Sequence, residues 1–183
     1  VDQKYFFTQF RYDALQKAKE KQKLLLDSEK AKKTSLNLHE RPYLGTVGAI
    51  ALDKNGNLAA ATSTGGMTNK MTGRIGDSPI IGSGTYADND SVAVSCTGTG
   101  DIYMRVNAAH EVSALYKYKT SDVQKAAEEA VKEVKALGGS GGIISIDKHG
   151  HTGFAWTKDK LGMYHGEARL GAKPIVYWPL GEK

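Results

Sequence analysis

Thr46, which stands between Gly45 and an apolar run, is the first candidate for chemistry in this chain. A threonine hydroxyl is too weakly acidic to attack an amide unaided, but the α-amine of the same residue can act as its base where a chain begins there. That amine has a reference pKa of about 7.7 to 8.0, so a useful fraction is uncharged at neutral pH. Thr46 is internal, so this chemistry requires a cut between Gly45 and Thr46. Gly45, which lacks a Cβ, can adopt strained geometry there at little steric cost.

A second group of hydroxyls follows at Thr62, Ser63 and Thr64. Side chains alternate along a strand, so Thr62 and Thr64 share one face, and either can hydrogen-bond the Thr46 hydroxyl. The preference of threonine for strands explains the same residues without any chemistry.

Arg74 and Asp77 are a cation and an anion three residues apart in a loop bounded by glycines. Such a pair suits a zwitterionic amino acid, because arginine binds an α-carboxylate with two parallel hydrogen bonds and aspartate accepts from an α-ammonium group. An ordinary surface ion pair is the alternative interpretation.

The run from Cys96 to Gly100 joins a predicted strand to a predicted helix. Backbone N–H groups converge at a helix N-terminus, and such a turn can hold an oxyanion. A phosphate cradle is the alternative, but the lysine and the spacing of a nucleotide-binding loop are absent. We interpret Cys96, the single cysteine, as a buried core residue, and the five histidines as surface residues without metal-ligand spacing.

Composition predicts the first elements that must position these residues. Residues 5–33 lack Gly and Pro and favour one long helix ending near Asp27, followed by an extended linker to residue 44. Beyond it, the Asn55-Gly56 turn predicts a hairpin of strands 46–52 and 57–63. Strands 80–86 and 91–96 are expected to complete an antiparallel meander.

The second half of the chain is predicted to be helical and then extended again. We expect helices at 102–117 and 121–137, the second capped by Ser121, and then a glycine cluster and a hairpin of 143–146 with 153–156. This order predicts an α+β domain with helices segregated to one face of antiparallel sheets.

Charge and hydropathy limit the classes of partner that we expect for this chain. The formal net charge is +5, but most of the excess lies in lysines before residue 46 that are interleaved with acidic residues, as on a solvated helix face. We therefore expect no nucleic-acid partner. No apolar run approaches the roughly 20 residues of a membrane span, so we expect no membrane partner. We expect a cytoplasmic protein, and the start at Val1 leaves a periplasmic or secreted location open.

Four motifs taken together resemble the plant-type L-asparaginase and isoaspartyl peptidase family of N-terminal nucleophile hydrolases. The likeness is close from Gly45 to about Asp101 and looser from there to near the C-terminus. The motifs are Gly-Thr-Val-Gly at 45–48, Thr-Ser-Thr-Gly-Gly at 62–66, Gly-Arg-Ile-Gly-Asp-Ser-Pro at 73–79 and Thr-Gly-Thr-Gly at 97–100.

The resemblance implies a four-layer αββα sandwich, made as a precursor that cleaves itself between Gly45 and Thr46. Residues 1–45 would be the last helix and linker of the α-subunit, and residues 46–183 the β-subunit. The implied roles are Thr46 as nucleophile and base, Thr64 as a contact of its hydroxyl, Arg74 and Asp77 as ligands of the substrate carboxylate and ammonium, Gly100 as a backbone contact to the ammonium, and Thr97 and Gly98 as the oxyanion hole.

The implied reaction is attack on the side-chain amide of L-asparagine, or on the isopeptide bond of a β-aspartyl dipeptide. Water then hydrolyses a covalent β-aspartyl-threonine intermediate. The resemblance implies an α-subunit portion as partner and a dimer of αβ units. We expect no cofactor, and the structural sodium ion of the family belongs to a loop expected outside this chain.

Two alternative functions stay open. One is a glycosylasparaginase-like hydrolase, although that branch usually has Asp where this chain has Gly45. The other is an unprocessed or truncated module that only binds or supports structure.

Overall fold

The structure is a computed structural model that describes residues 1–28, 45–157 and 162–177. These residues fall into two units, which are described separately below. The first is Val1–Gly45 with Gly65–Arg74, and the second is Thr46–Thr64 with Ile75–Lys183.

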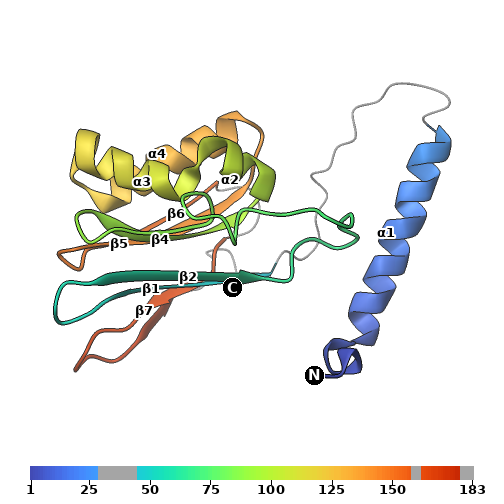
Figure 1. Cartoon of the computed structure of the whole chain (residues 1–183), viewed down its shortest axis with the longest axis horizontal. Helices are drawn as coiled ribbons and strands as arrows, with labels where there is room; N and C mark the ends of the chain where they lie inside the picture. Colours follow the sequence, from blue (N-terminus) through green and yellow to red (C-terminus); the bar gives the residue numbers. More distant parts are fainter. Residues whose placement is uncertain (29–44, 158–161, 178–183) are drawn as a thin grey trace. The chain divides into compact units, whose positions relative to one another are not determined.

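The first unit contains the predicted N-terminal helix. A short 3-10 helix, η1 (Gln3–Phe6), precedes α1 (Gln9–Ser28) (Figure 1). The prediction of one long helix is confirmed except for its start, where the Asp2 side chain accepts from the Lys4 N–H at 2.9 Å and closes a separate turn. Asn69 Nδ2 donates to Gln22 Oε1 at 2.6 Å and joins the 65–74 segment to α1. The predicted linker falls almost wholly on residues 29–44, outside the described residues.

The second unit begins with the predicted hairpin. Strands β1 (Thr46–Leu52) and β2 (Leu58–Thr64) pair antiparallel, with Thr46 opposite Thr64 and Leu52 opposite Leu58. The Asp53 carboxylate fixes the turn by accepting from the N–H groups of Asn55 and Asn57, both at 2.8 Å. The hairpin prediction is confirmed to within one residue.

A second sheet has the strand order β3-β4-β5-β6, all antiparallel. Its strands are Thr85–Ala87, Val92–Gly98, Gly141–Asp147 and Thr152–Trp156. The predicted single meander is wrong, because β1 and β2 form their own sheet and β4 pairs with β5 from far along the chain. Most of the predicted strand 80–86 is a turn instead, with Ile80 N donating to Asp77 O at 2.9 Å.

The helices cover one face of this sheet, and the β1–β2 hairpin lies against the other (Figure 1). They are α2 (Gly100–Val106), α3 (Ala108–Leu115), a π-helical turn η2 (Tyr116–Thr120) and α4 (Val123–Ala136). The second unit is thus mixed α and β with antiparallel sheets, and the predicted segregation of helices to one face is confirmed.

Two details of the helix prediction are wrong. Asn107 adopts a left-handed conformation, with φ of 54°, and divides the predicted helix 102–117. Asp122 rather than Ser121 caps α4, because its carboxylate accepts from the Lys125 N–H at 3.0 Å.

The main core lies between the helices and the sheet. Its largest fully buried side chains include Tyr103, Val92 and Ile143, and Cys96 is 1% exposed among them as predicted. A small hairpin of β7 (His165–Glu167) and β8 (Ile175–Tyr177) was not predicted. Among the described residues, no helix is long and apolar enough to cross a membrane.

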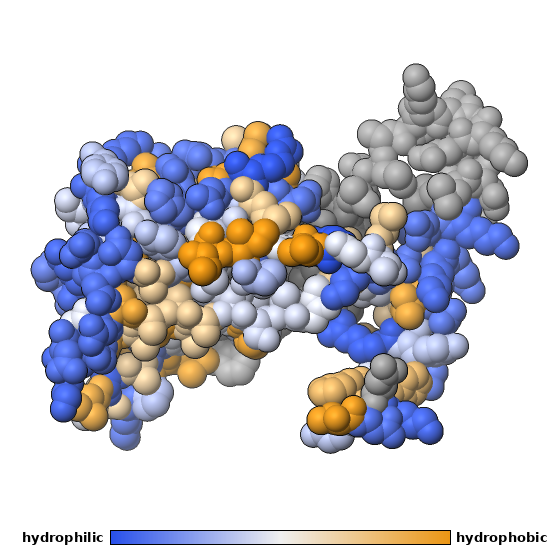
Figure 2. Space-filling model, in the orientation of Figure 1, coloured by the Kyte–Doolittle hydropathy of each residue, from blue (hydrophilic) through white to orange (hydrophobic). Residues whose placement is uncertain are grey.

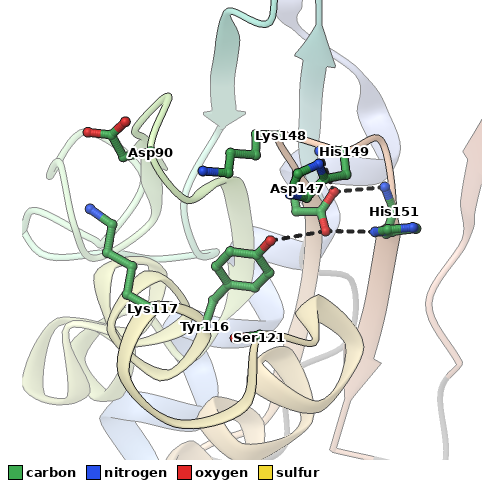
Figure 3. Close-up of a pocket in the computed structure, with 8 residues that line it drawn as sticks. All are labelled: Asp90, Tyr116, Lys117, Ser121, Asp147, Lys148, His149 and His151. Carbon is green, nitrogen blue, oxygen red and sulfur yellow. Dashed lines mark hydrogen bonds and ion pairs between the residues drawn. The ribbon is translucent and has the colours of Figure 1, made fainter.

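Asp147, at the end of β5, is a buried anchor for the turn into β6. Its Oδ1 accepts from the N–H groups of His149 and His151 at 2.8 and 2.9 Å, and its Oδ2 lies 2.9 Å from His151 Nδ1 and 3.3 Å from the Tyr116 hydroxyl (Figure 3). Burial raises the pKa of this carboxyl, but hydrogen bonds from His151 and from the two backbone N–H groups outweigh burial and hold the pKa below its ordinary value.

A carboxyl whose pKa is lowered by folding stabilises the protein above its unfolded pKa, and that stabilisation is lost as the pH falls through the folded pKa. Asp147→Asn is therefore expected to lower the free energy of unfolding by about 2 to 3 kcal/mol at pH 7. The gap to wild type should narrow below about pH 4. Urea unfolding across this pH range measures both effects.

The exposed Asp90→Asn is the matched control and should behave as wild type. An Asp147→Asn protein as stable as wild type at pH 7 would contradict the assigned role of this carboxylate.

Candidate active site

The hairpin brings the hydroxyls of Thr46 and Thr64 together. Thr46 is the first residue of β1 and Thr64 the last of β2, and the antiparallel register places them directly opposite each other. Thr46 Oγ1 donates to Thr64 Oγ1 at 3.3 Å. Their side chains also share one face of the hairpin, the one turned toward the β3–β6 sheet.

Thr62 shares this face but has different partners. Its hydroxyl donates to Gly84 O at 3.0 Å and lies 2.6 Å from Ser95 Oγ. Of the two hydroxyls that the sequence left open, it is therefore Thr64 that contacts Thr46.

Thr97 and Gly98 form the end of β4, where β4 meets the start of β5. Gly98 and its partner Gly141 have φ values of 146° and 149°. A Cβ on Gly98 would lie 2.1 Å from Ser140 O, and a Cβ on Gly141 would lie 2.0 Å from Thr97 O. Only glycine fits either position.

The turn after Gly98 is also tied to residues near the start of β5. Thr99 N donates to Ser140 O at 2.8 Å, and Ser140 N donates back to Thr99 Oγ1 at 3.2 Å. Gly141 N donates to Thr157 Oγ1 at 3.2 Å. The glycine cluster that follows the predicted helix 121–137 thus also holds this strand end in place.

Asp77 is buried in the second unit, with 6% of its surface exposed. Burial raises the pKa of the Cys96 thiol well above its ordinary value, and the negative charge of Asp77 raises it further. A thiol with such a pKa stays protonated at neutral pH, which agrees with Cys96 as a core residue and not a nucleophile.

Four other residues were predicted for the site, namely Gly45, Arg74, Asp77 and Gly100. Gly100 is the first residue of α2, and Gly45 is exposed. Arg74 belongs to the first unit and Asp77 to the second, so their pairing around a substrate stays a prediction.

A cavity of about 360 Å³ lies at the other end of the β4–β5 pair (Figure 3). Val92 opposite Asp147 marks that end, whereas Gly98 opposite Gly141 marks the end with the candidate residues. The cavity contains none of the predicted site residues. It is lined by Asp90, Tyr116, Lys117, Ser121, Asp147, Lys148, His149 and His151. Over residues 1–28, 45–157 and 162–177, no three His, Cys, Asp or Glu side chains are grouped to hold a metal ion.

Comparison with known sequences decides the family. A family model described as asparaginase matches residues 1–173. The chain belongs to the asparaginase family. The resemblance inferred from the four motifs is thereby confirmed.

Similar members of the asparaginase family come from bacteria and animals. The chain is 47% identical to the isoaspartyl peptidase of Escherichia coli over 177 residues, which are 96% of this chain and 53% of that protein. It is 46% identical to the isoaspartyl peptidase of Salmonella typhimurium, over 93% of this chain and 53% of the relative. It is 43% identical to the human isoaspartyl peptidase/L-asparaginase, over 78% and 46%. The chain thus spans about half the length of these relatives.

Gly98→Ala tests the close approach at the end of β4. The substitution is expected to lower the free energy of unfolding by more than about 4 kcal/mol or to prevent folding, because its Cβ collides with backbone atoms. Gly56→Ala is the matched control, since Gly56 also has a positive φ, 86°, but no described atom lies within 4 Å of its Cβ position. The control should lose only about 1 kcal/mol. Equal stability of the two variants in thermal or urea unfolding would contradict this account.

Proposed function

We propose that the protein is an autoprocessing amidohydrolase that cleaves the side-chain amide of L-asparagine and the isopeptide bond of β-aspartyl dipeptides. The observation that carries the proposal is the hydrogen bond from Thr46 to Thr64, made at the first residue of a strand directly after Gly45. The names of the relatives, isoaspartyl peptidase and L-asparaginase, support the same substrates.

Cleavage between Gly45 and Thr46 would release the α-amine that the nucleophile needs. The freed amine takes the proton of the Thr46 hydroxyl, and the oxygen attacks the side-chain carbonyl carbon of the substrate. Thr64 accepts from that hydroxyl in the present structure and so orients it. The amine then protonates the leaving nitrogen, and water hydrolyses the β-aspartyl-threonine ester to aspartate.

Two further groups complete the proposed site. Thr97 and Gly98, held by the tight glycine pairing with β5, would stabilise the oxyanion of the tetrahedral intermediate. Arg74 and Asp77 would bind the α-carboxylate and α-ammonium of the substrate, with Gly100 adding a backbone contact. No cofactor enters this mechanism.

The outer face of the hairpin supports a further layer and hence the αββα sandwich. Val47 is 72% exposed, and the four alanines that follow it on this face are exposed too, in the register Ala49 with Ala61 and Ala51 with Ala59. Figure 2 shows mildly hydrophobic residues gathered over the hairpin. Sheets bury such faces against another layer. We propose that an α-subunit portion covers it, and that two αβ units form the dimer implied by the resemblance.

The two alternative functions, a glycosylasparaginase and a module without activity, have less support. The relatives' names and Gly45 favour an isoaspartyl peptidase over a glycosylasparaginase. A module without activity would not require the paired hydroxyls of Thr46 and Thr64. The cytoplasmic location stays a prediction.

Thr46→Ala should abolish aspartate release from both L-asparagine and β-aspartyl-leucine, because it removes the attacking oxygen. Thr46→Ser is the matched control and should keep measurable activity, since it retains a hydroxyl. Release of aspartate at the wild-type rate by Thr46→Ala would remove Thr46 from its role.

Arg74→Ala should raise KM for both substrates at least tenfold, while self-cleavage continues, because only substrate binding needs the guanidinium. Arg11→Ala removes an exposed arginine of the same unit and should leave KM unchanged. Steady-state kinetics and the mass of the processed chain test this assignment. A defect in self-cleavage with an unchanged KM would contradict it.

A further inference from the structure

We propose that Thr62 and Ser95 are positioning residues, whose hydrogen bond sets the placement of the Thr46 hydroxyl against the Thr97–Gly98 strand end. The inference rests on the proposed function above. It adds two residues that touch neither the reacting atoms nor the substrate in that mechanism.

The two hydroxyls form a directional link between the two sheets. Thr62 Oγ1 donates to Gly84 O at 3.0 Å, so its single proton is used there. Ser95 must therefore donate to Thr62 across their 2.6 Å contact. Gly84 O also accepts from Cys96 N at 2.9 Å, which ties the acceptor itself to β4. Both bonds of Thr62 thus lead to β4, and Ser95 is only 3% exposed.

The other strand of the hairpin approaches the same point. Gly48 lies opposite Thr62 in the register, and a Cβ on Gly48 would lie 2.3 Å from Ser95 Oγ. No larger residue fits beside the serine without movement. Both β1 and β2 are therefore held against one side chain of β4.

On β1, β2 and β4, the residue that takes part in this inter-sheet contact lies close to a residue of the candidate site. Side chains two residues apart share a face, about 7 Å from each other. Gly48 is two residues from Thr46, Thr62 two from Thr64, and Ser95 two from Thr97.

The neighbouring inter-sheet positions, Ile50, Leu58 and Ala60, are apolar. Apolar contacts are non-directional, whereas a hydrogen bond fixes both distance and direction. Asn89, in the turn before β4, also holds the hairpin, because its Oδ1 accepts from Leu58 N at 2.7 Å and its Nδ2 donates to Asn57 Oδ1 at 3.2 Å. Those bonds lie at the far end of β2, six residues from Thr64. The Thr62–Ser95 bond is the one that lies beside the paired threonines, and it therefore fixes how they stand against Thr97 and Gly98.

The test compares Thr62→Val, which keeps the shape without the hydroxyl, with Thr62→Ser, which keeps the hydroxyl. Kinetics are measured on fully processed natural protein, checked by mass, well below the unfolding temperature of each variant. Thr62→Val should lower kcat for β-aspartyl-leucine at least tenfold with KM within twofold of wild type. Thr62→Ser should keep kcat within threefold.

Ser95→Ala should also lower kcat at least tenfold. The double variant Ser95→Ala with Thr62→Val should lose no more than Thr62→Val alone, because Thr62→Val already removes the Thr62–Ser95 bond together with the Thr62–Gly84 bond. Ser63→Ala, on the outer face of the same strand, is the control and should leave kcat unchanged.

A folded Thr62→Val protein with the kcat of wild type would overturn the proposal, as would losses in kcat that multiply in the double variant. An inactive wild-type protein would instead refute the proposed function, so the two failures are distinguishable.

Discussion

The antiparallel pairing of Thr46 with Thr64 is the contact on which the rest of the candidate site depends. It places a strand's first residue, and therefore the α-amine that a cut would expose, beside a second hydroxyl on the neighbouring strand. The register is set at the far end of the hairpin by the Asp53 turn, and a slip of one residue would turn Thr46 to the opposite face.

The two ends of the β3–β6 sheet are held by different kinds of contact. At one end, the buried Asp147 carboxylate accepts hydrogen bonds from the turn into β6 and from the Tyr116 hydroxyl. At the other end, Gly98 and Gly141 approach each other so closely that no side chain fits at either position. Side-chain hydrogen bonds hold the first end and close backbone packing holds the second, where the proposed chemistry lies.

Local signals in the sequence predicted local structure well. The Asn55-Gly56 turn and the alternation around it were sufficient for the hairpin, and the four motifs were sufficient for the family. The pairing of β4 with β5 was not predictable, since it joins residues 43 to 55 positions apart and depends on how the helices between them pack. The choice of Asp122 over Ser121 as helix cap depended on the left-handed conformation of Ser121.

Parts of the candidate site could also not be predicted from the sequence. Spacing alone left Thr62 and Thr64 equivalent. The resemblance implied Thr64, and the structure agrees, because the register places Thr64 opposite Thr46 while Thr62 bonds to Ser95. Ser95 follows an apolar run and was not predicted as a site residue. The one signal that could have identified it is a polar residue at a buried position of a strand. The pairing of Arg74 with Asp77 stays a prediction, because the two belong to different units.

In the proposed mechanism, Thr46 must become a chain terminus before it can attack the substrate. The most direct test is the intact mass of the natural protein during incubation at neutral pH, followed alongside aspartate release. A new fragment that begins at Thr46 is expected, with activity rising in step with it. A chain that stays uncut between Gly45 and Thr46 and still releases aspartate would contradict the account.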